Sequence, residues 1–182
     1  DAYFNMGQYD SSVAFYNKIL TEHAGTPYVF DAINGIQYSF VAKGDIAGAV
    51  QVIDIYGKRD KSKDYADELF LKKGEIYYSA GDYNNAITAY NEFMDEFPAS
   101  PLVADALFWI GKSYRSLNKL PEARQTFRAL SGRYPASDMT ISAVIELASM
   151  YTAEKAENEA LKAVNEIINN FKGNSRYPEL LY

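Results

Sequence analysis

The sequence predicts an all-α fold, an α-solenoid of tandem helix–turn–helix units with a period of 37 residues. Three series of residues predict it. A turn series keeps the 37-residue spacing along the whole chain: Gly7, Gly44, Gly81, Asn118 and Lys155. A small-residue series follows five positions later (Ser12, Ala49, Ala86, Ala123, Ala160), and a large-residue series follows four beyond that (Tyr16, Ile53, Tyr90, Phe127, Val164). A fixed period of this length indicates one supersecondary unit stacked on copies of itself.

The third copy defines the unit most clearly. Residues 65–78 place apolar or small side chains at helical spacing, which predicts an amphipathic helix. Gly81 and Asp82 interrupt it, because glycine readily takes the left-handed conformation that ends a helix. Residues 83–94 form the second predicted helix. Pro98 and Pro101 cannot lie inside a helix, so they separate this copy from the next, with Ser100 as the expected N-cap.

The other copies follow the same plan. We expect helices at 29–42 and 46–56, at 102–116 and 121–132, and at 140–153 and 157–171. A single array over 1–182 then has repeats at about 1–27 (partial), 28–63, 64–100, 101–137, 138–174 and 175–182. Residues 1–5 hold the last turn of one helix and 175–182 the opening of another. Solenoids normally end in polar capping elements, so we expect the chain to be a fragment of a longer protein or to lack its ends.

Composition narrows the function classes. The net charge is −6 with no basic stripe, which argues against nucleic-acid binding. The chain has no cysteine, and no apolar run approaches the roughly 18 residues of a membrane span. No nucleophile–base pair, paired carboxylates, metal cluster or phosphate loop is present in the sequence. We therefore expect no enzyme activity and no cofactor or metal.

Three features have an ordinary explanation and a functional one. His23, the single histidine, lies near the end of a predicted helix, which favours a surface or capping role over catalysis. Residues 58–64 form a charged run, interpreted as a solvated linker, with contact to an anion or lipid headgroup as the alternative. Trp109, the single tryptophan, either packs between neighbouring repeats or anchors a partner.

The aligned copies resemble the tetratricopeptide repeat. The third copy carries the residues of that motif in register: Phe70, Gly74, Tyr77, Gly81, Tyr83, Ala86, Tyr90 and Pro98. The fourth copy matches with Leu107, Gly111, Tyr114, Leu120, Ala123, Phe127 and Pro135. The resemblance covers nearly the whole chain and implies a right-handed α-solenoid. It also implies that small residues, such as Gly111, let the paired helices approach closely.

This chain departs from the motif at particular positions. Its period is 37 residues, against about 34 for the family, with the extra residues between repeats. Gln37 stands where the other copies have Gly74, Gly111 and Ala148, which predicts looser packing in the second copy. Bulky side chains also stand where the family often has alanine: Tyr56, Phe93, Leu130 and Ile167.

The resemblance implies a concave groove lined by the first helix of each repeat. The candidate groove residues are Asp31, Asn34, Tyr38, Glu68, Leu71, Glu75, Tyr78, Asp105, Phe108, Lys112, Arg115 and Ser149, with Val41 at an equivalent position. Exposed aromatic side chains beside charges suit an extended peptide or a partner helix. The alternative for Tyr38, Tyr78 and Phe108 is packing between adjacent first helices. Lys112 and Arg115 together would form a weak anion clamp.

These observations favour a non-enzymatic scaffold that binds a peptide or partner protein. Residues 97–101 and 134–137, together with 106–111, are similar to segments of tetratricopeptide-repeat proteins of the bacterial cell envelope, of the barrel-assembly lipoprotein and Tol-Pal coordinator types. We therefore expect a periplasmic or outer-membrane-associated protein, with a cytoplasmic location as the alternative. A regulatory module of a larger signalling protein, and self-association through uncapped repeat ends, are the other hypotheses.

Overall fold

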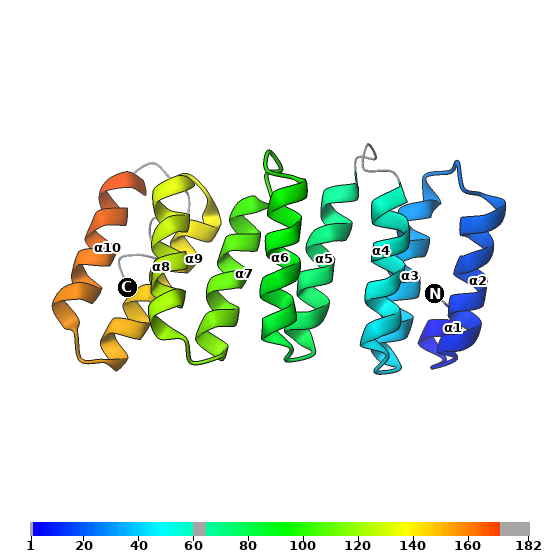
Figure 1. The fold of residues 1–182 in the computed structure, drawn as a ribbon, viewed down its shortest axis with the longest axis horizontal. Coiled ribbons are helices and arrows are strands. Elements are labelled where there is room, and N and C mark those ends of the chain that lie inside the picture. The colour runs from blue at the N-terminus through cyan, green and yellow to red at the C-terminus, as the bar shows by residue number, and fades with distance from the viewer. Residues whose placement is uncertain (1, 60–64, 172–182) are drawn as a thin grey trace. The chain divides into compact units, whose positions relative to one another are not determined.

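The computed structural model describes residues 2–59 and 65–171 of the chain. Within them it contains ten helices and no strand (Figure 1). The helices are α1 (Ala2–Asn5), α2 (Tyr9–Glu22), α3 (Tyr28–Ala42), α4 (Ile46–Arg59), α5 (Ala66–Ser79), α6 (Tyr83–Glu96), α7 (Val103–Ser116), α8 (Leu120–Arg133), α9 (Asp138–Ala153) and α10 (Glu157–Phe171). The predicted all-α class is confirmed, and most helix ends lie within a few residues of the predicted ones.

The chain divides into two compact units, residues 1–89 and 90–182, with the boundary inside α6. In the first unit, α2 packs on α3, α3 on α4 and α4 on α5 (Figure 1). In the second unit, α7 packs on α8, α8 on α9 and α9 on α10, and α7 also packs on α9. These helices therefore pack mainly on their neighbours in sequence, which is the packing expected of helical repeats.

The turn series adopts one backbone conformation in all five copies. The φ angles are positive at Gly7 (70°), Gly44 (78°), Gly81 (77°), Asn118 (57°) and Lys155 (57°). After each turn residue, the next N–H donates to the carbonyl five residues back, for example Asp45 to Phe40 at 2.9 Å. This is the Schellman pattern of helix ends. The left-handed ending predicted from Gly81 is confirmed, and it extends to two positions without glycine.

The second helices of the hairpins begin at Tyr9, Ile46, Tyr83, Leu120 and Glu157, each 37 residues after the one before. Two of them have an aspartate cap. Asp45 Oδ1 accepts a hydrogen bond from the Gly48 N–H at 2.8 Å, and Asp82 Oδ1 accepts one from the Asn85 N–H at 3.2 Å. Lys119 precedes α8 and provides no such side-chain bond.

The first helices of the later repeats begin after a serine. Ser137 is the N-cap of α9, and its Oγ accepts a hydrogen bond from the Met139 N–H at 3.2 Å. Ser100 Oγ accepts from the Leu102 N–H at 3.1 Å, but Leu102 is the residue that directly precedes α7. Ser100 thus caps the turn before α7 and is not the N-cap residue predicted from the sequence.

The small and large series form the interior of the hairpins. Ala49, Ala86, Ala123 and Ala160 are buried, and so are the large residues Tyr16, Ile53, Tyr90 and Phe127. A Cβ atom built on Gly111 would lie 2.4 Å from Cε1 of the Phe127 ring, closer than side chains can approach. The prediction that a small residue lets the paired helices approach is therefore confirmed at Gly111.

Three remaining sequence features can be located. His23 is the exposed C-cap residue of α2, at the helix end where the sequence placed it, and its backbone N–H donates to the Ile19 carbonyl at 2.9 Å. The charged run begins inside α4, which ends at Arg59, and continues at 60–64, outside the described residues. The helix expected at 175–182 also lies outside them. Among the described helices, none combines the length and apolar character needed to cross a membrane.

Candidate functional site

The predicted groove residues of the first unit come from α3 and α5, and they differ in exposure. Asp31, Tyr38 and Glu68 are exposed, and Glu75 is half-buried. Leu71 is only 7% exposed and belongs to the buried core, so its side chain does not reach the surface. Tyr78 and Asn34 are half-buried as well, and the Tyr78 ring lies edge-on to Tyr83, with ring centroids 5.3 Å apart.

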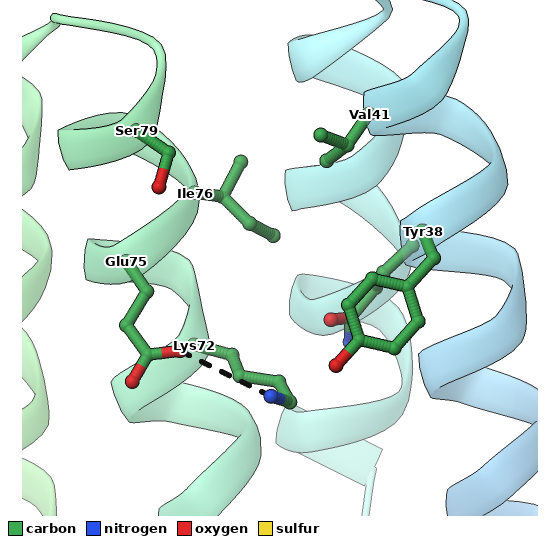
Figure 2. A pocket seen from close by; sticks show the side chains of 7 residues that line it. Tyr38, Val41, Lys72, Glu75, Ile76 and Ser79 are labelled. Atoms are coloured by element: carbon green, nitrogen blue, oxygen red, sulfur yellow. Dashed lines mark ion pairs between the residues drawn. The ribbon is translucent and has the colours of Figure 1, made fainter.

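A pocket of about 160 Å³ lies between α3 and α5. Its lining residues are Gln37, Tyr38, Val41, Lys72, Glu75, Ile76 and Ser79. Figure 2 shows the Val41 and Ile76 side chains facing one another across the gap, with Tyr38 and Lys72 beside them. The pocket therefore combines an apolar pair with a ring of polar and charged groups.

The charges of the pocket are concentrated on one side of α5. Lys72 Nζ lies 5.7 Å from the centroid of the Tyr38 ring, within the range of a cation–π interaction. The same ammonium group lies 3.9 Å from Glu75 Oε2 (Figure 2). The neighbouring Lys73 pairs with Asp54 of α4 at 3.2 Å instead. Lys72 is thus the lysine of α5 that faces the pocket.

Gln37 is the buried polar residue of this lining, with 2% of its surface exposed. Its Nε2 atom has no hydrogen-bond partner within the described residues. Asn34 Oδ1, one turn earlier on α3, is a buried acceptor that also has no hydrogen-bond partner within the described residues. Sequence reasoning noted Gln37 for its size only. A buried amide without a partner costs about 1–3 kcal/mol of folding free energy. This unpaired amide marks Gln37 as unusual more strongly than its size does, and only the structure reveals it.

In the second unit, the two predicted basic groove residues pair with a residue that the sequence did not single out. Lys112 Nζ donates to Glu146 Oε1 at 2.7 Å, and Arg115 Nη1 donates to Glu146 Oε2. Glu146 lies on α9, and its side chain is 16% exposed. An internal carboxylate therefore compensates the positive charge expected around Lys112 and Arg115. Glu146 lies 34 residues after Lys112 and 31 after Arg115, and this spacing alone does not predict the contact.

The other predicted residues of the second unit serve different purposes. Phe108 is half-buried and packs on the core, with its ring centroid 5.9 Å from that of Phe127 on α8, the second helix of the same hairpin. Trp109 lies edge-on to Phe108 at 5.6 Å and is half-buried. Burial raises the pKa of Asp105 above the usual range of an aspartate, partly opposed by a backbone hydrogen bond. Ser149 is exposed on α9.

Among residues 2–59 and 65–171, no three histidine, aspartate or glutamate side chains gather as a metal site would require. The pocket between α3 and α5 holds one carboxylate and one ammonium group, with no histidine in its lining.

Family models decide what kind of repeat this is. A model described as tetratricopeptide repeat matches residues 71–138, and a second model with the same description matches residues 1–22. These two segments are tetratricopeptide repeats. The family resemblance is thus supported in both units, whereas nothing in these matches distinguishes a cell-envelope type. No curated protein matches the sequence.

Solved structures with the same fold agree with the family models. MamA superposes with a TM-score of 0.63 at 17% identity, covering 97% of this chain and 96% of that one. BtubC (BKLC) from P. vanneervenii superposes with a TM-score of 0.64 at 14% identity, covering 92% of this chain and 75% of that one. YrrB is a tetratricopeptide-repeat protein described as having an unusual peptide-binding site. It superposes with a TM-score of 0.55 at 16% identity, covering 98% of this chain and 86% of that one. At these identities the likeness establishes the fold, and tetratricopeptide repeats are a class of protein-interaction scaffold.

Proposed function

We propose that this protein is a non-enzymatic scaffold that binds a peptide segment of a partner on the face formed by α3 and α5. The pocket between these helices is the observation that carries the proposal, because it places exposed Tyr38 and Val41 beside half-buried Ile76. Concave sites that combine apolar surface with a few polar groups are typical binding sites. YrrB, which shares the fold, is described as having a peptide-binding site.

The second unit offers less for such a partner. Glu146 already compensates Lys112 and Arg115, and Phe108 packs on the core. A partner with a carboxylate would have to displace Glu146 from both cations. We therefore assign the main binding surface to the first unit, and Lys112 and Arg115 to the stability of the α7–α9 contact.

A selection from a random displayed-peptide library on the purified chain tests this function. Selected peptides are expected to bind the native chain, and the double variant Tyr38→Ala, Val41→Asp should weaken that binding at least tenfold. Ile55→Asp is the matched control, because Ile55 is 53% exposed on α4, away from the pocket lining. Equal binding by the native chain and the double variant would contradict the assignment of the surface.

We also propose that the chain acts in a bacterial cell envelope. The support is the similarity of residues 97–101 and 134–137 to repeats of envelope proteins. Fractionation of the source cells, with the chain detected by antibody beside periplasmic and cytoplasmic markers, tests this location. Recovery with the cytoplasmic marker alone would contradict it.

A further inference from the structure

The pocket between α3 and α5 exists where the second copy departs from its own repeat pattern. At the position of Gln37, the other copies carry Gly74, Gly111 and Ala148. In the fourth copy, Gly111 lets the Phe127 ring pack directly on the helix backbone. In the second copy, a longer and almost fully buried side chain occupies this place, and Gln37 is one of the residues that line an opening between α3 and α5.

Burial of this amide without a partner needs an explanation. Gln37 Nε2 can donate two hydrogen bonds, and it makes none within the described residues. Most buried polar side-chain atoms in native proteins do have a partner. Nε2 is itself buried, so an acceptor oxygen that a ligand brings into the pocket would reach this donor once the Gln37 side chain turns toward the opening.

The size and apolar lining of the pocket define the rest of that ligand. A volume of about 160 Å³ is close to the roughly 150 Å³ of an apolar cavity that holds benzene. There is therefore room for one aliphatic or aromatic side chain between Val41 and Ile76, which face one another in Figure 2. The acceptor for Gln37 would then be a main-chain carbonyl next to that side chain.

The charges around the pocket indicate the flanking residues of the ligand. Asp31 precedes Tyr38 by two helical turns on α3, and Glu68 precedes Glu75 by two turns on α5, so each pair shares a face. Both outer carboxylates are exposed. Two turns span about 10 Å, which an extended peptide covers in about three residues. A basic side chain three residues from the apolar one would reach this acidic end.

We propose that the pocket recognises an extended peptide with an apolar anchor residue, whose adjoining main-chain carbonyl accepts a hydrogen bond from Gln37 Nε2. A lysine or arginine lies about three residues away on one side, toward Asp31 and Glu68. This inference rests on the proposed peptide-binding function and deepens it. Gln37, which breaks the repeat pattern, is the residue that sets the specificity of this copy.

An array of short acetylated peptides tests the proposal. The central position carries leucine, methionine, phenylalanine or glycine, and the position three residues to either side carries lysine or glutamate. We expect binding with an apolar centre and lysine on one side only. Glycine-centred peptides that bind as well as leucine-centred ones, or glutamate peptides that bind better, would overturn it.

The best peptide of the array is then titrated against Gln37→Met, which keeps the length of the side chain and removes its donor. We expect affinity to fall roughly tenfold, the effect of one lost hydrogen bond to a buried group. The melting temperature should stay the same or rise, because the variant removes a buried amide without a partner. In the native chain, the side-chain amide resonance of Gln37 should shift on binding.

Gln51→Met serves as the control, because Gln51 is exposed on α4 and outside the pocket lining. Unchanged affinity in Gln37→Met, with loss of binding in the Tyr38→Ala, Val41→Asp variant, would overturn the role of Gln37 and leave the proposed function intact. Failure of every peptide in the array to bind the native chain would overturn both.

Discussion

At the scale of single residues, glycine and alanine decide how closely the helices of a hairpin approach. Gly111 of α7 has no side chain, and the Phe127 ring of α8, which is fully buried, occupies the space that a Cβ would need. Gly35 of α3 lies equally close to the Tyr16 ring of α2, so it permits a close approach between neighbouring hairpins. These residues are required for packing and carry no information about a ligand.

Substitution of Gly111 by alanine tests this packing role. The new methyl group would lie 2.4 Å from the Phe127 ring, which is closed in on all sides. Overpacking of a filled core costs about 1–3 kcal/mol, so we expect the midpoint of chemical denaturation to fall accordingly. Gly132→Ala is the control, since nothing lies within 4 Å of its Cβ position. It should be neutral or slightly stabilising, because alanine favours helix, and a similar loss in both variants would contradict the argument.

At the scale of the element, the turn conformation is uniform but the helix caps are not. All five hairpin turns have positive φ at the same position. The caps that follow differ, because Asp45 and Asp82 accept a backbone N–H whereas Lys119 does not. Ala156, which precedes α10, has no side-chain acceptor to offer. The repeats therefore share one fold and differ in local stability.

Replacement of Ala156 by aspartate should stabilise α10. The new carboxylate would accept an N–H of the first turn as Asp45 does in α4, which is worth about 1 kcal/mol. We expect the protection of α10 amides from hydrogen exchange to increase by about that amount. Aspartate introduced at the exposed position 158, inside the first turn, adds the charge without the cap. An equal gain from Asn158→Asp would show that charge, and no capping bond, is responsible.

The sequence predicted helices better than surfaces, and the reason lies in what each depends on. Helix positions depend on local periodicity and on turn residues such as Gly81, so the boundaries of the hairpins could be read from the chain. The pairing of Lys112 and Arg115 with Glu146 depends on how side chains of two helices meet. Whether the buried amide of Gln37 finds a hydrogen-bond partner depends on the width of the opening between α3 and α5. Neither property is contained in the spacing of residues.

At the scale of the whole molecule, each compact unit has a hydrophobic core among its described residues. Leu69 and Ile53 belong to a core built by α2 to α5, and Leu147 and Phe127 belong to one built by α7 to α10. Repeat proteins draw their stability from the repeats themselves and from contacts between nearest neighbours. Damage to one core should therefore act first on the helices that share it.

Reciprocal truncations test this independence. Leu69→Ala and Leu147→Ala each remove a side chain that is almost fully buried, at 0% and 2% exposure, and each should cost about 2–5 kcal/mol locally. Hydrogen exchange read by mass spectrometry should show Leu69→Ala lowering protection in α2 to α5 more than in α8 and α9. Leu147→Ala should give the reverse. An equal loss of protection along the chain in both variants would show one cooperative unit.

Peptide binding at the α3–α5 face should follow the same division between the units. We expect the affinity to fall in Leu69→Ala and to persist in Leu147→Ala.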